Sequence, residues 1–401
     1  MTSLSTSARI DLSIDITWEK DGITHKEHYF ADQFNCWRDI IPGSLFEKLL
    51  DSKRQDTISV ELCPGELVPE HRSEKVIVLP LTRLNSSSPA GRLTAGRFYP
   101  QGLISGAPGI FKGNLNPFRC VALHGDRITA DLNHPLAGTP VIVEMTPHGN
   151  ESLKPEERGG GCTDWFDIAL SGPGMQARYN RQPTNFFSEK SFDRKDSEPD
   201  SVFYATDRFV RHIDSKAQQN LTDIYRTLLH PGEAVLDLMA GWESHLPGEL
   251  QLSCVHGLGL NASELAKNSQ LTEHTVQDLN RNSRLSFKDR TFNAVICSLS
   301  VEYLVDPIRL FKEVARVLKP GGIFAVSFSN RWFPEKAVRI WEGLHDFERM
   351  GLVTEYFLES GRYDSISTAS MRGYPRPDDD KYSRKFRFSD PVYAVIGRNK
   401  K

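Results

Sequence analysis

The chain has little that would tie it to a membrane or to nucleic acid. No apolar run approaches the roughly 20 residues of a membrane-spanning helix, and the first residues, MTSLSTSARIDLS, lack the apolar core of a secretory signal. The formal net charge of -3 and the pI near 6.5 exclude a strongly basic surface for nucleic acid or an anionic membrane. We therefore expect a cytoplasmic protein with no nucleic-acid or membrane partner.

Paired cysteines are also lacking. The six cysteines are scattered through the 401 residues, and none has the CxxC spacing of a zinc site or a redox pair. His134 has the side chain of a metal ligand, but a lone histidine in a tight turn favours a structural role, so we predict no metal site. With 39% hydrophobic and 25% charged residues, the composition is that of a globular chain with room for two domains.

The first 150 residues contain strand-like segments rather than helices. Alternating apolar residues separated by turn residues predict an antiparallel β domain. One short helix is expected at 44–50 and an exposed loop at 85–91. The predicted strands are 10–19, 56–62, 75–81, 118–132 and 139–147.

Residues 148–202 are rich in Gly, Pro, Asn and charge. This composition predicts a linker wrapped on the second domain. Its middle, SGPGMQARYNRQPTNFF (171–187), mixes aromatic, basic and glycine residues. Such a mixture is typical either of a loop that covers a ligand or of a simple surface connection.

After residue 203, helices and strands alternate. The segment 212–229 has apolar residues at helical spacing and stops before Pro231-Gly232. Continuous apolar runs separated by helices predict a parallel sheet covered on both faces. The predicted strands are AVLDL (234–238), LSCVHGLGL (252–260), AVICSLS (294–300), GGIFAVSFS (321–329) and DPVYAVIGRN (390–399).

One segment of the first half carries a specific signature. ITADLNHPLAGTPVIVEM (128–145) resembles the closing strands of SlyD-type peptidyl-prolyl isomerases of the FKBP class. The resemblance covers residues 10–147 and implies a mainly antiparallel β, FKBP/SlyD-like domain. Isomerases of this class use an apolar, aromatic-lined pocket, but PGSLFEKLL (42–50) lacks the Gly-Leu-Glu sequence that opens the family's helix. Two alternatives therefore stay open, an inherited scaffold or binding domain and an active isomerase.

Four segments of the second half resemble class I S-adenosylmethionine (SAM)-dependent methyltransferases. They are AVLDLMAGWESHLP (234–247), QDLN (277–280), FNAVICSLSVEYL (292–304) and VLKPGGIFAVSFSN (317–330). They follow one another in the order of that family, in a divergent version similar to methyltransferase type 11. The resemblance implies an α/β doubly wound (Rossmann-like) methyltransferase domain over residues 203–401, with SAM as its cofactor.

The resemblance also implies which residues bind SAM. The turn after the first strand lets the backbone approach the methionine part of the ligand. The acid that commonly binds the ribose after the second strand is missing: Gly259 and Asn261 stand there, with no acid until Glu264. Asp278 and the backbone amide of Leu279 are expected to bind the adenine. The predicted set is Asp237, Met239, Ala240, Gly241, Gly259, Asn261, Asp278, Leu279 and Ser298.

Acceptor chemistry is predicted at His245 and Tyr303. Methyl transfer from a sulfonium is an in-line displacement, in which the enzyme mainly positions the acceptor and excludes water. His245 follows the cofactor turn and is either the general base or a helix-capping or core histidine. Tyr303 and Glu302 are expected to line the acceptor pocket, although Tyr303 has a core role as its alternative. Candidate aromatic walls are Trp242, Trp332 and Phe333.

Three functional hypotheses follow. The first is a SAM-dependent methyltransferase acting on a small-molecule nucleophile, with a thiol or sulfide as the most concrete acceptor. No N/D-P-P-Y motif follows the fourth strand, which argues against the amide or exocyclic amine methylation linked with that motif. The second is a peptidyl-prolyl isomerase or chaperone-like protein with a degenerate methyltransferase domain, and the third is a non-catalytic interaction protein. The sequence indicates no oligomeric state.

Overall fold

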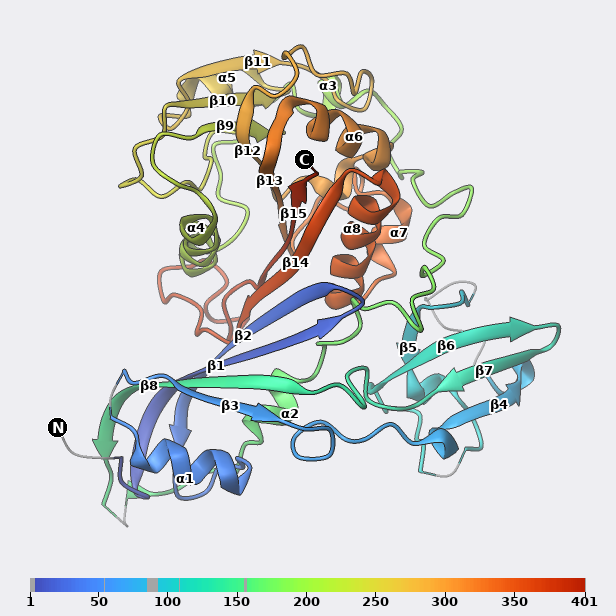
Figure 1. Ribbon diagram of the computed structural model, residues 1–401, viewed down its shortest axis with the longest axis vertical. Helices are drawn as coiled ribbons and strands as arrows, with labels where there is room; N and C mark the ends of the chain where they lie inside the picture. The colour runs from blue at the N-terminus through green and yellow to red at the C-terminus, as the bar shows by residue number, and fades with distance from the viewer. Residues whose placement is uncertain (1–3, 54, 85–92, 108, 155–156, 401) are drawn as a thin grey trace. The chain divides into compact units, whose positions relative to one another are not determined.

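The chain divides into two compact units (Figure 1). The computed structural model describes residues 4–53, 55–84, 93–107, 109–154 and 157–400. The first unit comprises Met1–Asn185 and Met371–Pro375, and the second comprises Phe186–Ser370 and Arg376–Lys401. The loop predicted at 85–91 lies outside the described residues. In the described part, no helix is both long and apolar enough to cross a membrane.

An antiparallel sheet forms the larger part of the first unit. Its strands are β1 (Ala8–Lys20), β2 (Ile23–Asn35), β3 (Ile58–Leu62) and β8 (Val141–Ser152), in the order β2-β1-β8-β3. The β1–β2 hairpin turns at Asp21 and Gly22, both of which have positive φ, as the tight two-residue hairpin turn requires. Buried and exposed residues alternate along β1 and β2, so one face of this hairpin packs into the core.

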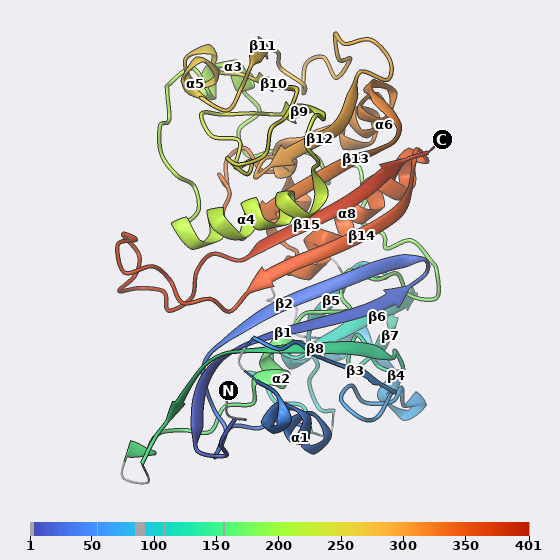
Figure 2. The same cartoon turned by 60° about the vertical axis from the view of Figure 1, so that its left-hand side comes forward.

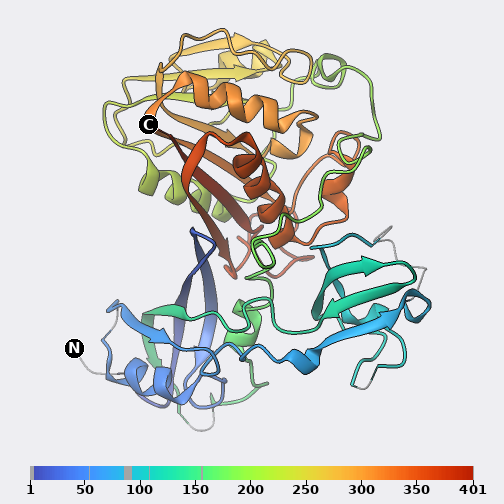
Figure 3. The same cartoon turned by 45° about the vertical axis from the view of Figure 1, so that its right-hand side comes forward.

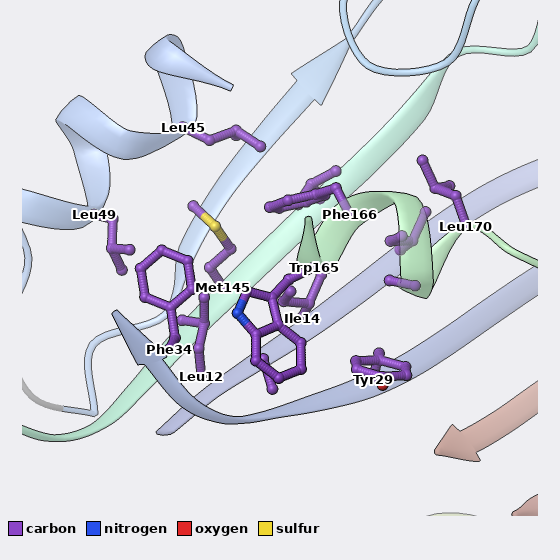
Figure 4. Packing of buried hydrophobic residues seen from close by; sticks show 14 of the residues in the cluster. Leu12, Ile14, Tyr29, Phe34, Leu45, Leu49, Met145, Trp165, Phe166 and Leu170 are labelled. Atoms are coloured by element: carbon purple, nitrogen blue, oxygen red, sulfur yellow. The ribbon is translucent and has the colours of Figure 1, made fainter. Parts of the chain in front are cut away.

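Two helices cover the core of the first unit (Figure 4). Helix α1 (Gly43–Asp51) contributes Leu45 and Leu49, and α2 (Trp165–Ala169) contributes Trp165 and Phe166. These side chains meet sheet residues from β1, β2 and β8, which include Leu12, Ile14, Phe34 and Met145.

The position of α2 corrects the predicted linker at 148–202. Helix α2 is part of the first unit's core, and the whole chain up to Asn185 belongs to that unit. The segment 171–187, the candidate ligand cover, therefore lies in the first unit as far as Asn185. The second unit begins at Phe186, so that it takes the rest of the predicted linker. The cause of the difference is a short apolar pair, Trp165-Phe166, inside a segment that is otherwise polar.

A second, smaller antiparallel sheet is inserted between β3 and β8 (Figure 3). It contains β4 (Val76–Pro80), β5 (Phe98–Pro100), β6 (Pro117–His124) and β7 (Arg127–Asp131), in the order β4-β7-β6-β5. Single-turn 3₁₀ helices at Ser73–Lys75, Leu81–Arg83 and Gln101–Leu103 flank its strands. The first unit is thus mainly antiparallel β, as expected, while its resemblance to SlyD-type isomerases stays a prediction.

The second unit is an α/β fold around a mostly parallel sheet. The strands are β9 (Ala234–Leu238), β10 (Cys254–Gly259), β11 (Glu273–Val276), β12 (Phe292–Ser298), β13 (Leu318–Ser329), β14 (Tyr363–Arg372) and β15 (Val392–Asn399). Their order is β11-β10-β9-β12-β13-β15-β14, and β15 runs antiparallel to β13. This order confirms the doubly wound fold predicted for the second half of the chain.

Helices cover both faces of this sheet (Figure 2). Helix α4 (Ser215–Leu228) lies on one face, and α6 (Pro307–Val317) and α8 (Asp346–Ser360) pack together on the other. Asp214 and Asp306 cap the amino ends of α4 and α6 with their side chains. Shorter helices are α3 (Asp200–Phe203), α5 (Ala262–Lys267) and α7 (Arg339–Glu342), and a 3₁₀ turn spans Val301–Tyr303.

The strand order locates the place where a ligand is expected. From β9 the chain first adds β10 and β11 on one side, and then crosses to add β12 and β13 on the other. In open α/β sheets, ligands bind outside the carboxyl ends of the strands at such a switch point. The carboxyl ends of β9 and β12 therefore define the candidate site.

Candidate active site

A cavity of about 390 Å³ lies at the carboxyl ends of β9, β10 and β12. It is lined by both predicted catalytic residues and by all nine predicted cofactor residues. Four segments that are distant in sequence supply them, namely 237–245, 259–261, 278–279 and 298–303. The eleven residues are Asp237, Met239, Ala240, Gly241, His245, Gly259, Asn261, Asp278, Leu279, Ser298 and Tyr303. Their individual roles stay predictions.

The turn after β9 is tightly constrained by the end of β10. The Ala240 N–H donates to the carbonyl of Leu258 at 2.8 Å, and a Cβ built on Gly259 would overlap the Ala240 carbonyl oxygen. Met239 has φ +60°, a left-handed conformation that costs a residue other than glycine about 1 kcal/mol or more. The turn therefore has a tight backbone in which Met239, and not a glycine, takes the left-handed conformation.

Asp237 brings a buried carboxyl to the base of the cavity. The residue is 2% exposed, and Oδ2 has no hydrogen-bond partner among the described residues. Burial raises the pKa of Asp237 to about 7, and a hydrogen bond with Ser244 opposes part of that increase. An orphaned carboxyl oxygen beside a cavity is an acceptor for a polar ligand group.

The side chain of Asn261 is committed to the protein. Its Oδ1 accepts from the backbone N–H groups of Ser263 and Glu264, which caps α5, and its Nδ2 donates to the Tyr204 carbonyl and to Asp207. These four bonds leave the amide no donor for a ribose hydroxyl in this conformation.

Glu264 instead brings a carboxylate to this side of the cavity. One turn of α5 places it against the β9 turn, with Oε2 3.5 Å from the position of a Gly241 Cβ. Its Oε1 accepts from the Arg208 N–H at 2.7 Å, and burial raises its pKa. From the sequence, Glu264 was judged to lie too far beyond the second strand to bind the ribose. Its position as the third residue of α5 was the signal that the first helical turn brings it back to the cavity.

The next strand end presents Asp278 and Leu279. Asp278 Oδ1 accepts from the N–H groups of Asn280 and Arg281 at 3.0 and 3.2 Å, whereas Oδ2 has no protein partner in the described part of the chain. Leu279 is buried. A fixed carboxylate with one open oxygen beside an apolar residue is what an amino-substituted aromatic ring needs.

Ser298 is held at the end of β12 by a buried tyrosine. Tyr225 from α4 shares hydrogen bonds with Ser298 Oγ at 2.6 Å and with Ser327 Oγ at 2.8 Å. The following residue, Leu299, has φ +53°. The floor of the cavity is therefore formed by backbone in a fixed conformation, and the Ser298 hydroxyl already makes a hydrogen bond within the protein.

His245 offers an uncharged imidazole to the cavity. Burial, together with the neighbouring His212 and Arg211, lowers the pKa of His245 to about 4. Its ring nitrogens have no protein partner among the described residues. Its backbone has φ +54°, and its carbonyl accepts a hydrogen bond from Thr222 Oγ1. It caps no described helix and stays uncharged at neutral pH.

Tyr303 is held as a neutral phenol. Its oxygen accepts from the Phe333 N–H at 2.9 Å, and burial with the nearby Glu302 raises its pKa. Glu302 itself does not line the cavity, which corrects the expectation from sequence: it is 1% exposed, its carboxylate oxygens have no partner in the described structure, and burial raises its pKa to about 8. Successive residues of a 3₁₀ turn point about 120° apart, so Tyr303 reaches the cavity while Glu302 points into the core.

A segment that sequence reasoning missed closes one side of the cavity. Residues 204–212, before α4, supply Tyr204, Val210, Arg211 and His212 to its lining. The segment is tied down by Glu264, by a hydrogen bond from Trp242 Nε1 to the Val210 carbonyl at 3.3 Å, and by the Arg211–Glu243 ion pair at 3.3 Å. No motif marks this segment, in which basic and aromatic residues are mixed with Ala205, Thr206, Asp207 and Val210.

The opposite wall follows β13. Trp332 and Phe333 line the cavity as predicted, together with Arg331 and, from the loop before β15, Tyr382. The Arg331 guanidinium lies 4.7 Å from the centroid of the Tyr382 ring. No group of three or more His, Cys, Asp or Glu side chains that could hold a metal occurs within the described residues.

The residues present fit a SAM molecule. Two carboxyl oxygens of the lining residues, Asp237 Oδ2 and Asp278 Oδ2, make no hydrogen bond within the described protein. At Gly259 the backbone has no room for a side chain. The Glu264 carboxylate adds an acceptor for hydroxyl groups. A zwitterionic nucleoside with amino and hydroxyl donors matches this donor and acceptor set.

Comparisons with known proteins agree with this fit. A family model described as a methyltransferase domain matches residues 250–326. The malonyl-[acyl-carrier protein] O-methyltransferase of Marinomonas sp. is 29% identical over 178 residues, which cover 41% of this chain and 64% of that relative. The demethylmenaquinone methyltransferase of Corynebacterium kroppenstedtii is 34% identical over 110 residues, which cover 26% of this chain and 45% of that relative.

A solved S-adenosylmethionine-dependent methyltransferase from Mesorhizobium loti is 19% identical, with a TM-score of 0.29, over 44% of this chain and 96% of that one. The chain spans less than two thirds of the length of the curated relatives it matches. The family model and these relatives agree on one point: residues 250–326, in the second unit, resemble the methyltransferase domain of known methyltransferases, which supports S-adenosylmethionine as the ligand of this cavity.

Proposed function

We propose that the protein methylates a small-molecule nucleophile, most concretely a thiol. The observation that carries the proposal is the single cavity in which the cofactor residues meet an uncharged, unpartnered His245. Its volume of about 390 Å³ lies near the lower end of the range for small-ligand pockets, which favours a compact acceptor.

SAM, when bound, supplies an electrophilic methyl group on a positively charged sulfur. The protein's part is to hold the acceptor in line and to keep water away. Rings from Tyr204, Tyr303, Trp332 and Phe333 supply an apolar wall for this purpose. The Tyr303 hydroxyl, held by the Phe333 amide, fixes that wall at the end of β12.

The low pKa of His245 selects among acceptors. A base with a pKa of about 4 gives little help in removing a proton from an alcohol, whereas a thiol, with an ordinary pKa near 8.5, reaches its nucleophilic thiolate form near neutral pH with little help from a base. A sulfide acceptor needs no base. Sulfur nucleophiles therefore suit this site better than hydroxyl groups.

Calorimetry with S-adenosylhomocysteine and with SAM tests the cofactor half of the proposal. We expect saturable binding in the micromolar range, and no binding at millimolar ligand would refute it. Methyl transfer from labelled SAM to a panel of thiols, phenols and amines tests the acceptor. The thiol proposal fails if phenols or amines are methylated and thiols are not.

Glu264→Gln should weaken S-adenosylhomocysteine binding about tenfold. The reason is that a neutral amide binds hydroxyl groups less strongly than a carboxylate, while the carbonyl of the new side-chain amide can still accept from the Arg208 N–H. Asp207→Asn is the matched control, because Asp207 also bonds the start of α5 but does not line the cavity. If both variants keep affinity within twofold of the wild type, Glu264 does not bind the ribose.

A further inference from the structure

Arg331 is the cavity arginine with unused donors. Its Nε donates to Asp390 Oδ1 at 3.0 Å, but its two terminal nitrogens have no protein partner among the described residues. The side chain is 30% exposed and lines the cavity. Arg211, the other arginine of the lining, is in contrast paired with Glu243 at 3.3 Å.

The guanidinium of Arg331 is held in a fixed plane. Asp390 is 4% exposed and also binds Arg376, which in turn contacts Asp214 and Asp380. The Tyr382 ring stacks against the guanidinium on the cavity side of this network, with 4.7 Å between the guanidinium carbon and the ring centroid. A fixed, planar fork with free N–H groups is the geometry that binds two oxygens of one anion side by side.

The adjacent wall adds an apolar surface. Trp332 and Phe333, which follow Arg331 in the chain, line the same cavity. Phe333 lies between Tyr303 and His212, with ring centroids 6.1 and 5.4 Å away. An acceptor bound here thus meets one cationic fork and a row of rings.

From these contacts we propose that the methyl acceptor is a thiol that also carries a carboxylate, and that Arg331 binds this carboxylate. The inference rests on the proposed function and narrows its acceptor class. A carboxylate is favoured over a phosphate because the guanidinium already pairs with Asp390 through Nε, and Asp390 together with Glu243 of the same lining would repel a dianion. The carboxylate is a recognition group and not the methylated atom, since pairing with Arg331 withdraws electron density from its oxygens.

The test compares paired thiols that differ only in charge. The probes are 3-mercaptopropionate with 3-mercaptopropionamide, and 4-mercaptobenzoate with 4-mercaptobenzamide, with 2-mercaptoethanesulfonate as another anion. For the wild-type full chain we expect the carboxylate of a pair to have a KM about 10- to 100-fold below that of its amide. Arg331→Gln should remove this preference, and Arg331→Lys should keep part of it, because lysine retains the charge without the fork.

The dissociation constant of S-adenosylhomocysteine, measured by calorimetry, distinguishes failure of the carboxylate inference from failure of the proposed methyltransferase function. It should stay within twofold in Arg331→Gln and in Arg309→Gln, an exposed arginine on α6 that serves as the control. The carboxylate inference is overturned if amides are used as well as carboxylates, if the sulfonate is preferred, if no carboxylate thiol is methylated, or if Arg331→Gln keeps the preference. Absence of S-adenosylhomocysteine binding by the wild type would instead overturn the proposed function.

Discussion

Lys336→Met should lower the free energy of unfolding by about 3 kcal/mol. Lys336 is fully buried, and its ammonium contacts Asp196 at 2.9 Å, Asp200 at 3.4 Å and the Glu198 carbonyl at 2.7 Å. Removing one partner of a buried ion pair leaves the other charge without compensation, which costs about 3–5 kcal/mol. We expect the lower end, because Asp200 keeps its bond to Arg194 at 2.7 Å.

The loss should extend to the cavity. Asp200 also accepts from Asn280 Nδ2 at 2.8 Å, and Asn280 in turn binds the Tyr303 carbonyl and the Val305 N–H. A shifted Asp200 therefore loosens the turn that carries Tyr303.

Urea denaturation measures the effect of Lys336→Met. The exposed Lys312 on α6 provides the control, since Lys312→Met should change stability by less than about 0.5 kcal/mol. Combining Lys336→Met with Asp200→Asn should cost less than the two single changes added together, because the contact between Lys336 and Asp200 is lost in both single variants and is counted twice in their sum. A loss below about 1 kcal/mol for Lys336→Met would contradict the ion-pair argument.

The second large effect is expected at the cofactor turn, where Gly259→Ala should weaken S-adenosylhomocysteine binding about 100-fold. The added methyl group would overlap the Ala240 carbonyl, and the Leu265 side chain stands 3.2 Å away on another side. Either the β9 turn or the end of β10 must move; a displacement of about 1 Å can cost about 100-fold in the rate of a catalysed reaction, and we expect a loss of similar size in affinity here. Overpacking should also cost about 1–3 kcal/mol of stability.

Gly248→Ala is the matched control for this substitution. Gly248 is exposed and has no atom within 4 Å of the place where an added Cβ would stand, so the same chemical change should be silent there. Calorimetry gives the affinity and thermal unfolding gives the stability. Near wild-type affinity in Gly259→Ala would show that the close approach of the two strand ends is not needed for cofactor binding.

The sequence predicted the parts of the site that follow from strand order. Apolar runs such as Ala234–Leu238 and Phe292–Ser298 mark buried parallel strands, whose carboxyl ends must meet in a doubly wound sheet. Asp237, Asp278 and Ser298 stand directly at those ends, so their meeting in one cavity needed no further information.

Other parts depend on loops and on packing that no periodicity records. Arg331, Tyr382 and the 204–212 segment reach the cavity from irregular backbone, whose path is set by contacts such as Trp242 to Val210. Helix α8 was not predicted because nearly all its sides are buried, so that it lacks the polar stripe of a surface helix. Helix α2 is a single turn, too short to outweigh the Gly- and Pro-rich residues around it.

Asp237 makes the cofactor site sensitive to the charge of what it holds. With a pKa of about 7, roughly half of this carboxyl is protonated at neutral pH. A ligand that brings a positive charge beside it favours the anion and expels a proton, whereas a ligand with a neutral sulfur does so less. Raising the pH from about 6 to about 8 should therefore favour SAM over S-adenosylhomocysteine. Equal proton release for the two ligands, measured calorimetrically in buffers of different ionisation enthalpy, would refute this linkage. Greater proton release on SAM binding would mean that the buried proton of Asp237 helps SAM to displace S-adenosylhomocysteine after each turnover.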